Sequence, residues 1–386
     1  MSGLTVICTG KIANTTVGHV DHAMSYPAGL QRLGHEVYVM DHVGSNRCAG
    51  PDNEPVPFDQ WTGRQHFREV ARAYGVWPRC CLIYKHGEAT DGMSFAQAVN
   101  VAKRCDVLIT RSGEISKAPE IFDQVKRRVY LDGNPGQTQV LLQERGEAHE
   151  ALNRYDHLFT LGLNIGAHGS PLPTGGRRWH PTVRPVLLPM WPMRPVLEGG
   201  RFTTISTWRG RATFEWLGQS AGEKSDNWLR FLDLPRDTGQ EFEIALRLDG
   251  PDRQADHTRF TEKGWRLTDP RSFRDVADYR AYIGQSRGEF SVAHNRYVEF
   301  RSGWFGDRSP LYLASGKPVL VQSTGIEPHL PTGKGLLTFT TMPEAVAGIE
   351  EINRDYARHC RAARELAEAY FDSDRVLTRM LGQIGF

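Results

Sequence analysis

The sequence predicts an α/β protein built from two doubly wound, Rossmann-like domains. Apolar segments of strand length alternate with segments of helix length on both sides of a proline-rich stretch, residues 181–195. The chain has 386 residues, which is enough for two domains of common size, and 39% of them are hydrophobic. We therefore expect an N-terminal domain over residues 1–190, a C-terminal domain over 200–369 and a terminal helix over 370–386.

Charge and cysteine content exclude several classes of protein. The net charge is +2, and residues 1–190 carry 20 basic and 18 acidic side chains, which leaves 27 of each for the remainder. Neither half has the excess of basic residues expected of a general nucleic-acid binder. No segment resembles a signal peptide or a membrane span, and the six cysteines show no Cys-x-x-Cys spacing. We expect reduced thiols and a cytoplasmic protein.

The first elements form a βαβ unit. Residues 4–8 are apolar and predict a buried strand, and a polar loop over residues 9–22 follows it. Residues 23–33 predict a helix that ends at Gly34, and residues 35–41 predict the second strand. The loop lacks a Gly-x-Gly-x-x-Gly motif, which argues against an NAD enzyme.

Further strands of the N-terminal domain are predicted at residues 105–113, 128–132 and 155–161, and residues 63–74 and 94–103 predict helices. Polar side chains follow two of these strands. Open α/β sheets bind ligands at the carboxyl ends of their strands, so these side chains are candidates for a site. They are Arg111, Ser112, Gly113, Asp132 and Asn134.

In the C-terminal domain, residues 202–208, 242–246 and 288–292 predict strands, and residues 279–286 predict a helix. A polar turn rich in small residues then leads to Pro310, which suits the first turn of a helix. Gly316 ends that helix, and residues 319–321 predict another buried strand. A helix N-terminus favours phosphate because its N–H groups are free. Asp307, Arg308 and Ser309 lie at this N-terminus, where Arg308 could bind a diphosphate and Asp307 could orient Arg308 or accept a hydrogen bond from a sugar hydroxyl.

The run Tyr312-Leu-Ala-Ser-Gly-Lys-Pro-Val-Leu resembles the A-x-G-x-P-V signature in the C-terminal domain of GT-B glycosyltransferases. The longer strings around Trp304-Phe-Gly-Asp-Arg-Ser, Asp132-Gly-Asn-Pro-Gly and Tyr370-Phe-Asp-Ser-Asp-Arg-Val-Leu resemble a poorly characterised bacterial group of these enzymes. The resemblance implies two domains across a cleft, with a terminal helix that crosses back to the first domain. It also implies a glycosyltransferase of the hexosyl type that uses a nucleotide-sugar as co-substrate, with no other cofactor and no metal.

The resemblance implies that the C-terminal domain binds the nucleotide-sugar and the N-terminal domain binds the acceptor. Retaining GT-B enzymes often have two glutamates where this chain has Gly303 and Leu311, so retaining and inverting mechanisms both stay open. For the donor diphosphate and sugar we expect Arg308, Asp307, Ser309, Lys224, Arg209, Gly303 and Ser302, with Arg211 as a weaker candidate.

An inverting mechanism needs a base in the N-terminal domain. The candidates are His19, His22 and Asp132, although Asp132 could instead cap the turn that follows it. For the acceptor side we expect Gly18, His22, Arg111 and Asn134. We expect no metal site, because the histidines show no metal-binding spacing and Asp372-Ser-Asp374 is best interpreted as a helix cap.

Two other functions fit the same architecture. A sugar-nucleotide epimerase would act on the nucleotide-sugar alone, and a non-catalytic two-domain protein would only bind a ligand. The sequence does not identify the acceptor, for which we expect a small molecule or a glycan before a nucleic acid. No membrane partner is expected.

Overall fold

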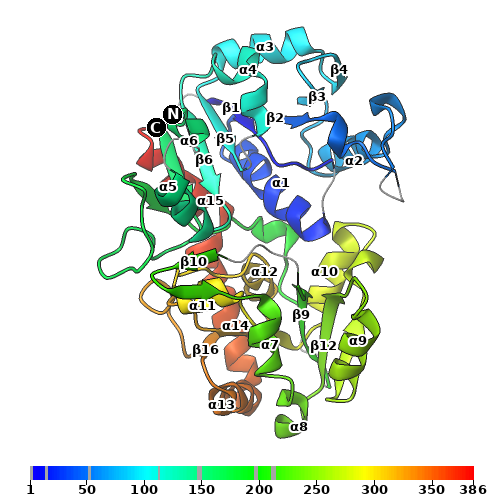
Figure 1. The fold of residues 1–386 in the computed structure, drawn as a ribbon, viewed down its shortest axis with the longest axis vertical. Helices are drawn as coiled ribbons and strands as arrows, with labels where there is room; N and C mark the ends of the chain where they lie inside the picture. Colours follow the sequence, from blue (N-terminus) through cyan, green and yellow to red (C-terminus); the bar gives the residue numbers. More distant parts are fainter. Residues whose placement is uncertain are drawn as a thin grey trace.

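A computed structural model describes residues 3–13, 16–50, 54–111, 114–145, 150–194, 199–209 and 214–386. The chain forms two lobes, each with a central sheet that helices cover (Figure 1). We call the lobe around the first sheet the N-terminal domain and the lobe around the second sheet the C-terminal domain. The predicted fold class, two doubly wound α/β domains, is confirmed.

The sheet of the N-terminal domain has eight strands in the order β4-β3-β2-β1-β5-β6-β7-β8. Every pair in it is parallel except the β3–β4 hairpin. The residues at its centre are β-branched or aliphatic, as expected of strands that are buried on both faces. The strands are β1 (Thr5–Cys8), β2 (Glu36–Val43), β3 (Cys80–Tyr84), β4 (Ala89–Gly92), β5 (Val107–Thr110), β6 (Arg128–Asp132), β7 (His157–Thr160) and β8 (Trp179–Pro181). The helices that accompany them are α1 (Val17–Arg32), α2 (Gly63–Ala73), α3 (Phe95–Arg104), α4 (Pro119–Phe122), α5 (Gln137–Arg145) and α6 (Glu150–Asn153).

The sheet of the C-terminal domain has six parallel strands in the order β13-β12-β9-β14-β15-β16. In chain order this is 3-2-1-4-5-6, the arrangement of a complete doubly wound domain, which places its ligand crevice between the first and fourth strands, β9 and β14. The strands are β9 (Phe202–Thr207), β12 (Phe242–Arg247), β13 (Trp265–Thr268), β14 (Gly288–Ser291), β15 (Val319–Gln322) and β16 (Leu336–Phe339). A separate antiparallel hairpin consists of β10 (Phe214–Trp216) and β11 (Gln219–Ala221).

The helices of the C-terminal half run from α7 to the end of the chain. The segment after β16 forms two consecutive helices, because Asp355 ends the first and caps the second. The helices are α7 (Lys224–Leu229), α8 (Leu234–Thr238), α9 (Arg253–Thr261), α10 (Val276–Gly284), α11 (Asn295–Glu299), α12 (Ser309–Ala314), α13 (Met342–Arg354), α14 (Tyr356–Leu366), the π-helix η7 (Ala367–Phe371) and α15 (Ser373–Gln383).

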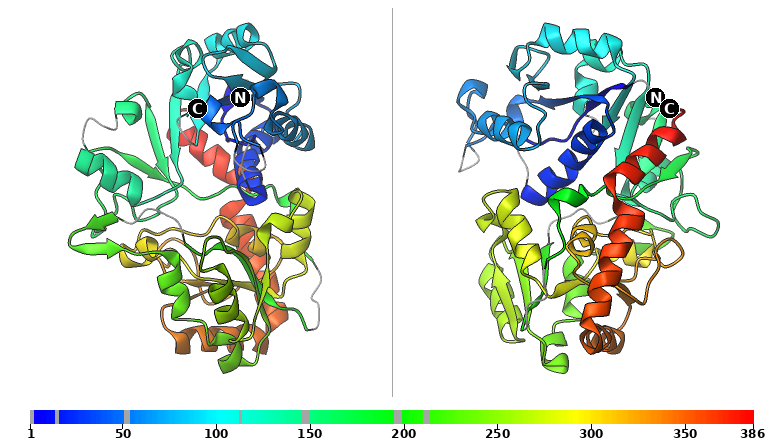
Figure 2. Two further views of the ribbon diagram at one scale, coloured as in Figure 1. Left: turned by 45° about the vertical axis from the view of Figure 1, so that its right-hand side comes forward. Right: turned by 180° about the vertical axis from the view of Figure 1, so that it is seen from behind.

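The last helix crosses from one domain to the other, as predicted. Figure 2 shows α14 and α15 running along the back of the molecule from the lower lobe to the upper one. Leu377, Met380 and Leu381 of α15 join the apolar cluster around β1 and α1. The Asp372 carboxylate accepts a hydrogen bond from the Asp374 backbone N–H at 3.1 Å, which confirms that this Asp-x-Asp sequence is a helix cap.

Several elements differ from the sequence prediction. Helix α1 begins at Val17, six residues before the predicted start, so His19 lies in its first turn and not in a loop. Lys224, for which the sequence analysis predicted no element, is the first residue of α7. The β3–β4 hairpin lies in a region where no element was predicted. Ser112, Gly113 and Arg211 lie outside the described residues. In the described ranges no helix is long and apolar enough to cross a membrane.

Candidate active site between the two domains

The two domains meet where helix α1 faces the loop that precedes α12. The Nδ1 atom of His22, on α1, lies 3.5 Å from the Oδ2 atom of Asp307, in that loop. Both residues were predicted as site residues, His22 from the acceptor side and Asp307 from the donor side. The fold therefore brings together two candidates that are 285 positions apart in the sequence.

Arg308 lies at the crevice of the C-terminal sheet, beside strands β9 and β14. Its Nε atom is 3.0 Å from the Oε1 atom of Glu289 and donates to the Thr204 hydroxyl at 2.9 Å. Its Nη2 donates to the Ser291 hydroxyl, also at 2.9 Å. The Glu289 side chain is fully buried, whereas Arg308 keeps some exposure. The guanidinium is thus held rigidly by β9 and β14, and its orientation does not depend on a ligand.

Glu289 is a buried acid surrounded by cations and hydroxyl groups. Burial raises the pKa of Glu289, and the charges of Arg308 and Lys224 oppose this, together with hydrogen bonds from Ser309 and Thr204. Lys224 and Ser309 are themselves buried. With Glu289 ionised, two cations share one carboxylate, which leaves one unit of positive charge at the ligand crevice of this domain.

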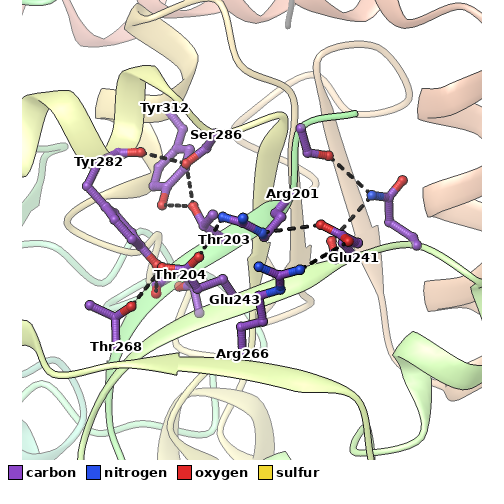
Figure 3. A network of polar contacts seen from close by, with 12 residues as sticks. Arg201, Thr203, Thr204, Glu241, Glu243, Arg266, Thr268, Tyr282, Ser286 and Tyr312 are labelled. Atoms are coloured by element: carbon purple, nitrogen blue, oxygen red, sulfur yellow. Dashed lines mark hydrogen bonds and ion pairs between the residues drawn. The ribbon is translucent and has the colours of Figure 1, made fainter. Parts of the chain in front are cut away.

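Arg308 is the N-cap residue of helix α12, and the polar network in Figure 3 anchors this helix. The Tyr312 hydroxyl lies 2.6 Å from the Thr203 hydroxyl, which lies 2.6 Å from the Ser286 hydroxyl. Ser286 in turn donates to the Tyr282 carbonyl of α10 at 2.8 Å. The network ties α12 to β9 and α10 and fixes the direction in which the helix presents Arg308.

His19 lies in the first turn of α1. Its Nε2 atom donates to the Gly10 carbonyl at 3.2 Å, so the neutral ring has its lone pair on Nδ1. Burial and the charge of Arg111 lower the pKa of His19 to about 4. The Asp41 carboxylate fixes the Gly10 loop, because it accepts from the backbone N–H groups of Gly10 at 2.7 Å and Ile12 at 2.8 Å.

His22 is buried, and its Nδ1 atom is hydrogen-bonded to Arg111. The Arg111 guanidinium donates to Nδ1 of His22 at 2.9 Å, so this nitrogen is unprotonated and the proton of the neutral ring is on Nε2. Burial and Arg111 lower the pKa of His22 to about 3. Nδ1 of the neutral His22 ring therefore interacts with Arg111, and the Asp307 carboxylate lies beside this pair.

Asp307 keeps a side-chain exposure of 48%, although groups from both domains surround it. Burial by itself raises the pKa of Asp307, but the contact with His22 and the charges of Arg184 and Arg111 outweigh it and hold that pKa well below the ordinary range. Arg184 also donates to the main-chain carbonyl of Asp307. Asp307 is an ionised carboxylate at the junction of the domains.

Asp132 is buried and accepts four hydrogen bonds. Oδ1 accepts from the Asn134 backbone N–H at 2.9 Å and the Thr138 hydroxyl at 2.7 Å. Oδ2 accepts from the Gln139 amide at 2.9 Å and the Thr160 hydroxyl at 3.0 Å. This arrangement is the turn cap that the sequence left open as an alternative, and Asn134 is exposed in that turn.

Other predicted donor residues contact protein groups. Ser302 and Gly303 join the domains through their backbones: the Ser302 carbonyl accepts from Asn164 N at 3.2 Å, and the Gly303 carbonyl accepts from Leu163 N at 3.3 Å. Arg209 forms a two-pronged ion pair with the buried Asp256. On the predicted acceptor side, Gly18 packs against the Tyr279 hydroxyl of the C-terminal domain.

No group of three or more His, Cys, Asp or Glu side chains that could hold a metal ion occurs among the residues that the structure describes.

Solved structures with the same architecture cover the whole chain. An alpha-glucosyltransferase in complex with UDP and a mismatched 13-mer DNA superposes with a TM-score of 0.60 and 12% identity, over 100% of both chains. The chain has the GT-B fold. HepE from Anabaena in complex with UDP-glucose is a second GT-B neighbour, with a TM-score of 0.61, 12% identity and 99% of each chain covered. A Rickettsia africae glycosyltransferase is a third, with a TM-score of 0.55, 11% identity, and 99% of this chain and 98% of that one covered. Neither a protein-family model nor a curated protein sequence matches the chain.

The sequence prediction missed four residues that pair beside the candidate site or at the junction of the domains. Glu289 carried a signal, since it is a charged residue inside an otherwise apolar strand, and such residues are rarely buried unless paired. Asp21, Arg184 and Asn164 carried none, because the partners that link them across the domains lie more than a hundred positions away in the chain.

Proposed function

We propose that the protein transfers a hexosyl group from a nucleotide-sugar donor to an acceptor hydroxyl. The observation that carries the proposal is the arrangement of Arg308 and Lys224 around the buried Glu289, in the ligand crevice of the C-terminal domain. A net positive charge there suits a nucleoside diphosphate. The UDP and UDP-glucose found with the alpha-glucosyltransferase and with HepE support the same class of donor.

In the proposed reaction the acceptor oxygen attacks the anomeric carbon as the bond from that carbon to the diphosphate breaks. The diphosphate leaves with the bonding electrons, and Arg308 and Lys224 stabilise the charge that develops on it. Asp307, ionised and half-exposed at the domain junction, is proposed to accept hydrogen bonds from sugar hydroxyls. Ser309 and the backbone of Ser302 and Gly303 shape the wall of this site.

For an inverting mechanism we propose His19 as the base that accepts the acceptor proton. Its Nδ1 carries the lone pair, since Nε2 donates to Gly10. Nδ1 of His22 already accepts from Arg111, and the Asp132 carboxylate already accepts four hydrogen bonds. We therefore assign His22 and Arg111 to positioning Asp307, and Asp132 to the turn that carries Asn134.

The acceptor that we propose is a small molecule or a glycan. We place the reaction in the cytoplasm, which the six buried, free cysteines support, because thiols persist in reducing compartments.

Incubation with a panel of nucleotide-sugars, followed by chromatography, tests the proposal. We expect slow release of a nucleoside diphosphate from one donor, with water replacing the acceptor. Arg308→Ala should weaken nucleoside diphosphate binding by about 10- to 100-fold, because a charged hydrogen bond contributes about 1.5–3 kcal/mol. Arg236→Ala, on the exposed helix α8 at the far end of the domain (Figure 1), is the matched control and should bind as the unaltered protein does.

Three outcomes would contradict the proposal in different ways. A new nucleotide-sugar isomer in place of free diphosphate would indicate the epimerase. Binding without turnover, with every donor and with added glycans, would indicate a ligand-binding protein. If the protein binds no nucleoside diphosphate, the proposed donor site is wrong.

A further inference from the structure

We propose that Arg184 is a positioning residue that holds the two domains together and fixes the Asp307 backbone against helix α1. Its catalytic consequence rests on the proposed glycosyl transfer, whereas its effect on domain closure does not.

Arg184 lies in the segment that connects the two domains, between β8 and β9, and only 3% of the residue is exposed. One terminal nitrogen of its guanidinium donates to the main-chain carbonyl of Asp307, in the C-terminal domain. The other terminal nitrogen donates to the carboxylate of Asp21, on α1 of the N-terminal domain. A single buried side chain therefore contacts both domains through separate atoms.

Asp21 is the residue that makes this contact specific. It is buried, and its second carboxylate oxygen accepts from the Tyr74 hydroxyl at 2.9 Å. Arg280, on α10 of the C-terminal domain, lies 3.9 Å from the same oxygen. Asp21 thus interacts with two cations, Arg184 from the connecting segment and Arg280 from the C-terminal domain.

The position of Asp21 in α1 links this contact to the candidate site. It directly precedes His22, whose Nδ1 lies 3.5 Å from the Asp307 carboxylate. Arg184 fixes the Asp307 main chain, and Asp21 fixes helix α1. Together they set the distance between His22 and the Asp307 carboxylate. If the C-terminal domain rotates away, the Asp307 carbonyl loses its charged donor, and the buried guanidinium keeps only Asp21. The charge-assisted hydrogen bond therefore favours the closed arrangement.

The chemistry of arginine is required for this role. A planar guanidinium can donate to a carbonyl and to a carboxylate at the same time, in two fixed directions, whereas the lysine ammonium is a single point charge. Arg184→Lys keeps the charge but not the fork, Arg184→Met removes both, and Asp21→Asn removes the charge of the partner. Arg68→Met is the matched control, because Arg68 pairs with the buried Asp91 entirely within the N-terminal domain.

The test combines small-angle scattering of the unliganded protein with nucleotide binding and steady-state turnover. We expect Arg184→Met and Asp21→Asn to increase the radius of gyration and to lower kcat by about 100-fold, the scale of a small misplacement of reacting groups. The UDP dissociation constant should change little, since Arg308 and Lys224 both belong to one domain. Arg184→Lys should lie between Arg184→Met and the unaltered protein. Arg68→Met should lower the melting temperature alone.

An unchanged radius of gyration and kcat in folded Arg184→Met would overturn the proposal. So would equal losses of kcat in Arg184→Met and Arg68→Met, which would show that general stability is responsible. If Arg184→Met does not fold, the same comparison is made with Arg184→Lys and Asp21→Asn. If the unaltered protein neither binds nor hydrolyses any nucleotide-sugar, the proposed function fails, and the radius of gyration still decides whether Arg184 holds the domains closed.

Discussion

Glu289 and Arg308 form an ion pair of 3.0 Å in which the acid is fully buried and the base keeps a side-chain exposure of 14%. The pair joins strand β14 to the N-terminus of α12. An arginine that is fixed in this way approaches a diphosphate without losing side-chain entropy on binding. The same carboxylate also reduces the positive charge that the diphosphate meets.

Glu289→Gln should therefore have opposite effects on the stability of the protein and on its affinity for UDP. The amide keeps the size of the acid but leaves Arg308 and Lys224 without a counter-charge, so the free energy of unfolding should fall by about 3 kcal/mol. The extra unit of positive charge should tighten UDP binding by roughly 3- to 10-fold. Urea denaturation and calorimetric titration measure the two effects. Glu241→Gln, an exposed acid on the same domain, is the control and should change neither. Weaker UDP binding in Glu289→Gln would show that the acid acts mainly by orienting Arg308.

His19→Ala should lower turnover by about 100-fold or more, the usual effect of losing a general base, and leave the UDP dissociation constant unchanged. Asp132→Asn should instead reduce stability by about 1–3 kcal/mol, because an amide nitrogen would face two of the four donors. Turnover and urea denaturation of both variants distinguish the roles. If His19→Ala keeps full turnover and Asp132→Asn loses it, Asp132 is the general base. If neither variant loses turnover, a retaining mechanism is preferred.

Stability should fall in mild acid because of His22. Its pKa is 6.5 in the unfolded chain and about 3 in the folded protein. Between these values the unfolded chain binds a proton that the folded chain does not, so the free energy of unfolding decreases as the pH falls below 6.5. The slope from this residue is at most about 1.4 kcal/mol per pH unit. The difference between the free energies of unfolding at pH 5 and at pH 7.5 should be smaller in His22→Gln than in the unaltered protein. His257→Gln, which alters an exposed histidine on α9, should keep the original slope, and equal slopes in all three proteins would rule His22 out.

Gly303→Ala should destabilise the contact between the domains. The φ angle of Gly303 is +72°, and an added Cβ would lie 2.8 Å from the Asn164 nitrogen and 3.0 Å from the Leu163 side chain. Gly333→Ala is the matched control: its φ angle is +98°, but no atom lies within 4 Å of the added Cβ. Both substitutions carry the left-handed backbone penalty, of about 1–2 kcal/mol. Only Gly303→Ala should lower the melting temperature further and increase the radius of gyration, and identical losses in the two variants would show that the approach to Asn164 is not critical.

The amino-acid sequence by itself determined the two doubly wound domains and most of the elements that bear the site. Strands such as Arg128–Asp132 and Val319–Gln322, the helix start at Pro310 and the cap at Asp372 follow from local patterns of apolar, proline, glycine and aspartate residues. These signals are local because backbone conformation and burial of a short segment depend mainly on its own side chains. They placed Asp307, Arg308 and Ser309 correctly at the N-terminus of α12.

Only the tertiary structure decided which candidates act together and which are already paired. Arg209 and Arg308 were both candidates for the donor site, yet Arg209 is paired with Asp256, while Arg308 is paired with Glu289 beside β9 and β14. His19 and His22 differ by one helical turn, yet Arg111 occupies Nδ1 of His22 and not that of His19. Arg184 and Asp21 are 163 positions apart in the chain and meet only in the folded protein. Each of these outcomes depends on a hydrogen-bond partner that comes from a distant part of the chain, and the satisfaction of buried polar groups is a property of the packed interior that no local pattern contains.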